Sequence, residues 1–256
     1  MSGKFQSARR SPRCLAIFAL GMLLSACSGA NTPKDQTPPL NILFVGNSFT
    51  YYNNSLHYHL GQLLKAANDG KADGTMRALT LSGTRLAEHL PGFSGRLEGT
   101  QWDWVVLQGH SREAYDGDVS SFRQTVSEMV SVIDGQGAKA ALFMTWAYTE
   151  EPQMTGVIST NYLLAGRQSG ASVVPVGLAF DRAGTQAPEI ALRTADRLHP
   201  TLAGTYLAAC VFYSWFYAMP ATGLEYTAGL DQQVAATLQR VATETVTTFT
   251  ASHARR

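Results

Sequence analysis

The stretch 41-NILFVGNSFTYYNN-54 decides how the rest of the chain is interpreted. An apolar run typical of a buried strand ends abruptly in Gly46, Asn47 and Ser48, and a helical pattern begins at Leu56. Gly and Asn are common turn residues and Ser suits a helix start, so local structure alone explains this junction. A hydroxyl on a sharp strand-to-helix turn is also exposed at the carboxyl edge of a sheet, beside N–H groups that stabilise an anion. Only the motifs in the rest of the sequence can decide between these two interpretations.

Strand-like and helical patterns alternate after residue 40. Further strands are expected at 76–82, 102–108, 140–146 and 172–176, and helices at 56–67, 119–133, 157–165, 202–218 and 230–248. Strands that alternate with helices form parallel β-α-β units, which are buried on both faces. The sequence therefore predicts one α/β domain over residues 40–256, a three-layer α/β/α sandwich with a five-stranded parallel sheet.

The N-terminal residues 1–26 have the composition of a secretory signal peptide, with four basic residues before the apolar run 14-CLAIFALGMLL-24. This run is too short to span a bilayer comfortably. The following 24-LSAC-27 resembles a bacterial lipobox, in which the cysteine is lipidated and becomes the new N-terminus. An ordinary signal peptide that happens to contain Cys27 is the alternative. Residues 27–39 are then the lipidated Cys27 and a flexible, Pro-rich tether.

Charge and motifs exclude several classes of protein. The chain has 20 basic and 19 acidic residues, and loss of 1–26 leaves 16 basic against 19 acidic. A nucleic-acid partner would need a basic face, so none is expected. No nucleotide fingerprint and no metal motif such as C-x-x-C or H-E-x-x-H occurs, so neither a cofactor nor a metal is expected. Cys210, in 207-LAACVFY-213, is predicted to be a small buried core residue.

A serine hydroxyl becomes a nucleophile only when a base removes its proton. Among the six histidines, His199 has the most suitable surroundings, in 195-ADRLHPTLAGTYLAA-209. Asp196, three residues earlier, can bend back to orient the imidazole. A polar loop with a helix cap is the alternative for this segment, but together with Ser48 it predicts a Ser-His-Asp triad. His110, which follows the third expected strand, is the second candidate for the base.

These blocks resemble the SGNH (GDSL-type) hydrolase superfamily over nearly all of residues 40–220. The Gly-Asn-Ser at 46–48 corresponds to the usual Gly-Asp-Ser, Gly83 to the Gly after the second strand, and 196-DRLHP-200 to Asp-x-x-His. The resemblance implies a flavodoxin-like fold with Ser48 as nucleophile, His199 as base and Asp196 as its orienter. It also implies an oxyanion hole from the N–H groups of Ser48 and Gly83.

The third block departs from the family pattern, which supplies an Asn from Gly-x-Asn. Here 107-LQGHS-111 is similar to the Gln-Gly-Glu-Ser version of sialate and carbohydrate acetylesterase relatives, which nominates Gln108 as a further oxyanion donor. A Gln satisfied by water at a strand end, or His110 in the third place, are the alternatives. Trp146, Tyr148 and Tyr115 fall in or beside loops after strands, either lining a substrate cleft or belonging to the core.

The resemblance implies a serine esterase that hydrolyses short acyl esters, with acetyl groups on carbohydrates as the leading expectation. A lipase, a thioesterase or an acyltransferase would use the same triad. A carbohydrate-binding lipoprotein without turnover is the alternative from another class, although binding alone does not require all three triad residues. The expected location is the bacterial cell envelope, with membrane contact only through lipid on Cys27. Ser28, in place of Asp, indicates the outer membrane by resemblance to Gram-negative lipoprotein sorting.

Overall fold

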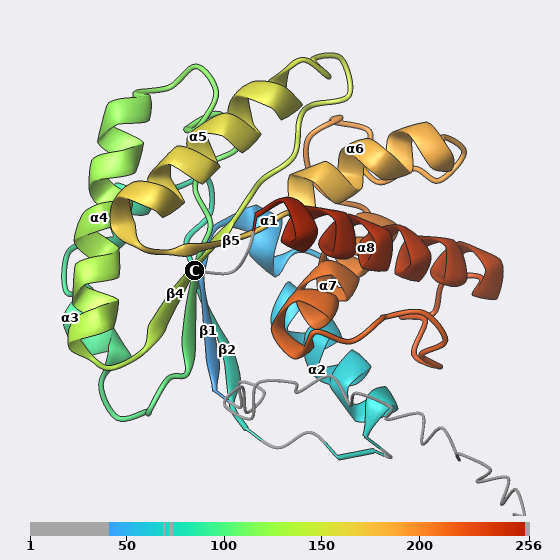
Figure 1. The fold of residues 1–256 in the computed structure, drawn as a ribbon, viewed down its shortest axis with the longest axis horizontal. Coiled ribbons are helices and arrows are strands. Elements are labelled where there is room, and N and C mark those ends of the chain that lie inside the picture. The colour runs from blue at the N-terminus through green and yellow to red at the C-terminus, as the bar shows by residue number, and fades with distance from the viewer. Residues whose placement is uncertain (1–40, 69, 72–73, 254–256) are drawn as a thin grey trace, which may run out of the picture. The chain divides into compact units, whose positions relative to one another are not determined.

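The computed structural model describes residues 41–68, 70–71 and 74–253 (Figure 1). The strands are β1 (Ile42–Gly46), β2 (Met76–Thr80), β3 (Trp104–Leu107), β4 (Lys139–Phe143) and β5 (Ser172–Val174). The helices are α1 (Ser48–Tyr51), α2 (Leu56–Ala67), η1 (Leu86–His89), α3 (Phe93–Leu97), α4 (Val119–Gly135), α5 (Met154–Ser169), α6 (Val176–Gln186), α7 (Leu202–Tyr217) and α8 (Gln232–Ser252). The expected signal peptide and the tether with Cys27 lie outside the described residues, so their assignment stays a prediction.

The five strands form one parallel sheet, as the sequence predicts, and their order in the sheet is β2-β1-β3-β4-β5. The chain places β2 on one side of β1 and then returns to place β3 on the other side. The order therefore reverses between β1 and β3, and in open parallel sheets ligands bind beyond the carboxyl ends of the strands at such a reversal. Ser48 and Gln108 directly follow these two strands.

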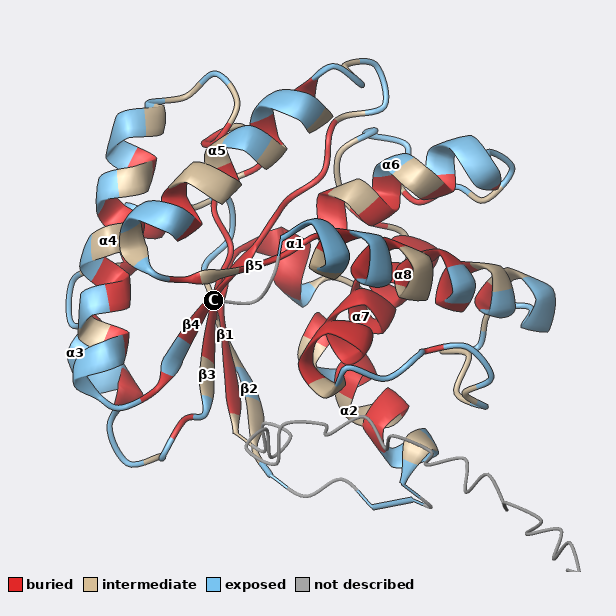
Figure 2. Cartoon of the chain, in the orientation of Figure 1, coloured by how far each residue is buried: buried red, intermediate tan, exposed pale blue. Residues whose placement is uncertain are grey.

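The side chains of β1 alternate between two separate cores, because successive strand residues point to opposite faces of a sheet. Ile42 and Phe44 pack with residues of α2, α6, α7 and α8, whereas Leu43 and Val45 pack with residues of α3, α4 and α5. Figure 2 shows β1 buried, the edge strand β2 partly exposed, and α4 and α5 exposed along their outer side. Helices thus cover both faces of the sheet, which confirms the predicted three-layer sandwich.

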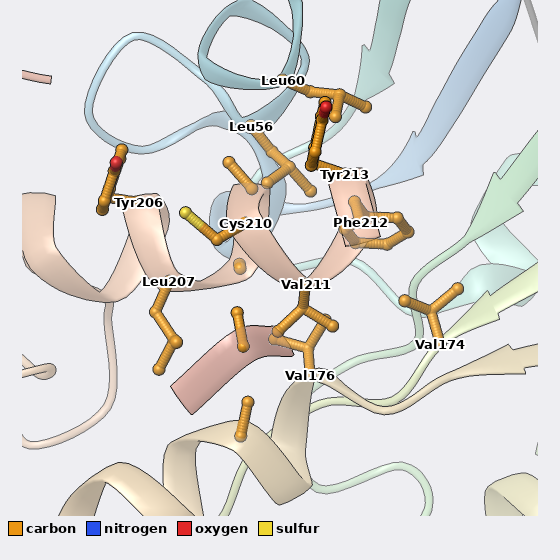
Figure 3. Packing of buried hydrophobic residues seen from close by; sticks show 14 of the residues in the cluster. Leu56, Leu60, Val174, Val176, Tyr206, Leu207, Cys210, Val211, Phe212 and Tyr213 are labelled. Carbon is orange, nitrogen blue, oxygen red and sulfur yellow. The ribbon is translucent and has the colours of Figure 1, made fainter. Parts of the chain in front are cut away.

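Helix α7 is buried on every side, from Ala203 to Phe216. A helix that is apolar all round needs neighbours all round, and α7 packs against α2, α6, α8 and β5. Figure 3 shows its side chains packed with those of α2 and with Val174 and Val176. Cys210 lies within this core as predicted, and burial raises the pKa of its thiol.

The structure corrects the expected fifth strand and adds the helix α6, besides the short helices α1, η1 and α3. The strand expected over 172–176 ends at Val174, and α6 begins at Val176. Pro175 lacks the N–H that a continued sheet ladder would need, and its fixed φ suits the residue before a helix. The expected fourth strand likewise ends at Phe143 instead of Trp146. None of the helices in the described part of the chain has the length and apolar character needed to span a membrane.

We expect Gly177→Ala to destabilise the fold and Gly184→Ala to leave it intact. Gly177 opens α6 against the end of β4, and a Cβ atom there would be built into the carbonyl group of Thr145. Overpacking of this kind costs about 1–3 kcal/mol. Gly184 lies in the same helix with open space around its Cβ position, where Ala is favoured over Gly by about 1 kcal/mol. Urea unfolding of both variants measures this difference, and equal stabilities would contradict the close approach.

Candidate active site

Ser48, His199 and Asp196 are joined by a chain of hydrogen bonds. The Nε2 atom of His199 lies 2.9 Å from Ser48 Oγ, and its Nδ1 atom lies 2.6 Å from Asp196 Oδ2. Ser48 is the first residue of α1, directly beyond β1, and its residue surface is 6% exposed. A proton on Nδ1, held by the carboxylate, leaves Nε2 free to accept the hydroxyl proton. The structure thus brings together the three side chains that the sequence nominated from two distant segments.

The two carboxylate oxygens of Asp196 have different partners. Oδ2 faces the imidazole, while Oδ1 accepts the N–H groups of Leu198 and His199, both at 2.9 Å, and the hydroxyl of Thr194 at 2.7 Å. Burial raises the pKa of this carboxyl, but the hydrogen bonds from His199 and Leu198 outweigh it and hold the pKa well below its ordinary range. Asp196 is therefore ionised at neutral pH. Its Oδ1 atom stabilises the loop of residues 194–199, and its Oδ2 atom orients the imidazole of His199.

An aromatic column connects the segment of Ser48 to the loop of His199. The ring of Phe49 stacks on Trp146 with centroids 4.2 Å apart, and Trp146 stacks on Phe180 at 4.1 Å. The indole N–H of Trp146 donates to the Leu198 carbonyl at 3.0 Å. Trp146 is 1% exposed, so it belongs to the core and does not line a cleft. Its contacts fix the backbone just before His199.

The turn that carries Ser48 is held from inside by Gln108. The Oε1 atom of Gln108 accepts the N–H of Asn47 and the hydroxyl of Thr50, both at 3.0 Å. Its Nε2 atom donates to Asn47 Oδ1 at 3.0 Å and to the carbonyl of Gly109. Because a main-chain N–H donates to Oε1, the orientation of this amide is unambiguous. All of these contacts are buried, on the side of the turn that faces the core.

These bonds correct the expected role of Gln108. Both N–H groups of its amide already have acceptors within the protein, and the side chain is 1% exposed. The structure therefore gives Gln108 a positioning role in place of the oxyanion role that the sequence suggested. Gly46 makes room for it, since a Cβ atom at Gly46 would lie 2.5 Å from Gln108 Oε1.

Asn47 ties the loop after β2 to the turn of Ser48. Its Oδ1 atom caps α1 by accepting the N–H of Phe49 at 3.1 Å, and its Nδ2 atom donates to the Thr84 carbonyl at 3.0 Å. Gly83 precedes Thr84 and has a φ of 69°, a conformation that favours glycine. The N–H of Ser48, at the first helical position, has no acceptor within its helix. An oxyanion hole made by Ser48 and Gly83 stays a prediction.

The histidines near the carboxyl edge other than His199 have structural contacts. The main-chain N–H of His110 donates to the carboxylate of Glu113 at 2.8 Å, and its imidazole Nδ1 atom accepts the main-chain N–H of Arg112 at 3.4 Å. Burial raises the pKa of Glu113. His89 is buried, with Nε2 3.1 Å from the Gly46 carbonyl. Among the residues that the structure describes, no group of three or more His, Cys, Asp or Glu side chains is placed to hold a metal ion.

The structure also reveals contacts to His199 that the sequence analysis missed. The ring of Tyr52 stacks on the imidazole, with centroids 4.4 Å apart and planes at 17°. The residues that follow, Asn53, Asn54 and Ser55, all have positive φ. The Asn-Asn pair at 53–54 is the sequence signal for such a turn, because Asn tolerates the left-handed conformation better than most residues.

Comparison with known proteins rests on solved structures, because no family model and no curated protein matches this chain. A DUF4886 family protein from Bacteroides uniformis has a TM-score of 0.67 at 20% identity, over 85% of this chain and 96% of that chain. A putative SGNH hydrolase from Slackia heliotrinireducens has a TM-score of 0.58 at 28% identity, over 68% and 97%. This chain has the SGNH hydrolase fold. An acetylxylan esterase from Geobacillus stearothermophilus is also similar, with a TM-score of 0.55 at 17% identity over 70% of this chain and 95% of that chain.

If Gln108 positions the turn of this SGNH fold, its replacement must lower stability as well as turnover. In Gln108→Glu, Asn47 Oδ1 and the Gly109 carbonyl lose their donor and face a buried carboxylate. Leaving buried polar groups unsatisfied costs about 1–3 kcal/mol, and more for charged groups, so we expect a loss of at least about 2 kcal/mol in the free energy of unfolding.

The exposed Gln136 at the end of α4 provides the control, and Gln136→Glu should change stability by less than about 0.5 kcal/mol. Urea unfolding with parallel ester assays makes the comparison. A Gln108→Glu variant of full stability but reduced kcat would instead support the oxyanion role.

Proposed function

We propose that this protein is a serine esterase that hydrolyses short acyl esters, with acetylated carbohydrates as the substrate class. The observation that carries the proposal is the hydrogen-bonded chain from Asp196 through His199 to Ser48, at the point where the strand order reverses. A hydroxyl, an imidazole and a carboxylate in one line are the requirement for acyl transfer through serine, and binding alone does not need them. The structural similarity to an acetylxylan esterase supports the choice of substrate.

In the proposed reaction, Ser48 Oγ attacks the ester carbonyl carbon while His199 Nε2 takes the hydroxyl proton. The negative charge that develops on the carbonyl oxygen is stabilised by the N–H groups of Ser48 and Gly83. Asp196 stabilises the imidazolium that forms. The tetrahedral intermediate then collapses, and the departing alcohol takes the proton from His199. Water, with His199 again as base, attacks the acyl-enzyme to release the acid and free Ser48.

We expect Ser48→Ala and His199→Ala each to lower kcat for p-nitrophenyl acetate by at least about 10⁴-fold, and Asp196→Asn to leave a small residual activity. Because the three residues act as a unit, the kcat of the double variant Ser48→Ala/His199→Ala should be no lower than that of either single variant. Turnover is compared for acetyl and octanoyl p-nitrophenyl esters, and for acetate release from acetylated xylan.

His110→Ala is the control for this test and should retain activity. If it were as damaging as His199→Ala with the fold intact, His110 would have to be the base. A fluorophosphonate probe that fails to modify Ser48 would favour a binding protein without turnover.

We further propose that the protein is attached to the cell envelope by lipid on Cys27, in the outer membrane where the cell is Gram-negative. The apolar run before 24-LSAC-27 and the Ser at position 28 support this location. The Pro-rich tether that follows leaves room for the domain to reach substrates away from the bilayer.

Mass spectrometry of the N-terminal peptide from the membrane fraction should find a lipid-modified Cys27. Cys27→Ser should abolish the modification, whereas Cys14→Ser, within the apolar run, should leave it unchanged. An unmodified Cys27 at the N-terminus, or internal to an intact chain, would contradict the lipid anchor.

A further inference from the structure

The loop between α1 and α2 contains three consecutive non-glycine residues with positive φ. The φ angles are 54° for Asn53, 68° for Asn54 and 71° for Ser55. A side chain makes this conformation unfavourable, and it persists only where the surrounding structure holds it. This loop is held by hydrogen bonds to the segment that contains His199.

The side-chain amide of Asn53 links the segment of Ser48 to the segment of His199. Its Nδ2 atom donates to the Pro200 carbonyl at 3.0 Å and to the hydroxyl of Thr205 at 2.8 Å. Pro200 directly follows His199, and Thr205 is a buried residue near the start of α7. One N–H group of this amide thus holds the backbone just after His199 against the segment that begins at Ser48, and the other holds the first turn of α7.

Asn53 is itself supported from α2. The Nε2 atom of His59 lies 2.6 Å from the Asn53 carbonyl, and its Nδ1 atom lies 2.8 Å from the hydroxyl of Tyr226. One neutral tautomer satisfies both contacts, with Nε2 as donor and Nδ1 as acceptor. His59 is 2% exposed, and burial lowers its pKa, which favours this neutral form. The Tyr226 carbonyl in turn accepts the hydroxyl of Tyr206 in α7 at 2.6 Å.

We propose that Asn53 is a positioning residue that sets the distance between Ser48 Oγ and His199 Nε2 by clamping the Pro200 carbonyl to the segment of Ser48. Trp146 holds the carbonyl before His199, and Asn53 holds the carbonyl after it. The inference rests on the proposed hydrolase function, because it assigns Asn53 to the alignment of that nucleophile and base. A misplacement of about 1 Å in a reacting group can lower a rate on the order of 100-fold.

Two substitutions separate the hydrogen bonds of Asn53 from its backbone conformation. Asn53→Asp keeps the shape and tolerates a left-handed φ, but a carboxylate cannot donate to the Pro200 carbonyl. Asn53→Gly relaxes the backbone and removes the amide altogether. Asn54→Asp and Asn54→Gly are the matched controls, because Asn54 is exposed and has the same left-handed conformation in the same loop.

The purified full chain and these variants are assayed with p-nitrophenyl acetate and with a fluorophosphonate. We expect both Asn53 variants to lower kcat and the rate of labelling about 10- to 100-fold, with KM and the final extent of labelling unchanged. The Asn54 variants should keep the wild-type kcat. Wild-type kcat in Asn53→Gly would mean that only the backbone conformation matters and would overturn the proposal. A lower extent of labelling at an unchanged rate would overturn it as well, since that pattern reports unfolding alone.

A spectroscopic readout separates this proposal from the proposed function. The proton between His199 Nδ1 and Asp196 should give a downfield proton NMR signal, because the hydrogen bond is short and charge-assisted. We expect Asn53→Asp to shift or broaden this signal and Asn54→Asp to leave it in place. If the wild-type protein neither hydrolyses esters nor reacts with the probe, the hydrolase proposal fails while the signal still tests the clamp. An unchanged signal in Asn53→Asp would overturn the clamp.

Discussion

The hydrogen bond from Ser48 Oγ to His199 Nε2 joins residues that are 151 positions apart in the chain. Local backbone preferences cannot set such a distance, so it depends on how the layers pack. The end of β1 places Ser48, and the loop before α7 places His199. Helix α7 is enclosed by α2, α6 and α8 on one face of the sheet. Because protein interiors are close-packed and transmit small shifts, the whole of this layer contributes to the alignment.

Side-chain amides bonded to the main chain carry out the finer positioning. Gln108 fixes the turn before Ser48 from inside the core, and Asn47 connects that turn to the loop of Gly83. Asn53 acts in the same way on the backbone after His199. An amide has donors and an acceptor in one rigid plane, so it can bridge two backbone segments and leave no buried polar atom unsatisfied. Buried amides at strand ends are therefore well suited to hold an active site without taking part in its chemistry.

Stacked rings complete this frame. The column of Phe49, Trp146 and Phe180 runs from the residue after Ser48 to the layer of α6. Above Phe180 lies the guanidinium of Arg193, 5.4 Å from the ring centroid, and its Nε atom donates to the Ala147 carbonyl at 2.9 Å. These contacts hold the segment of Ser48 against the segments around Trp146 and α6.

The sequence by itself determined the alternation of strands and helices, and hence the sandwich and its parallel sheet. It also nominated Ser48 and the pair Asp196 and His199, which the structure brings together, because a strand-to-helix turn and an i, i+3 spacing are local features. It did not predict α6, because Pro175 is compatible with a strand end as well as a helix start.

The partners of polar side chains were decided only by the tertiary structure. The sequence placed Gln108 at the correct edge of the sheet, yet both donors of its amide are used within the protein, by Asn47 Oδ1 and the Gly109 carbonyl. Asn53 meets the Pro200 carbonyl across 147 residues of chain. The physical reason is that a hydrogen bond depends on distances of a few tenths of an ångström, and the packing of α2 and α7 against the sheet sets those distances.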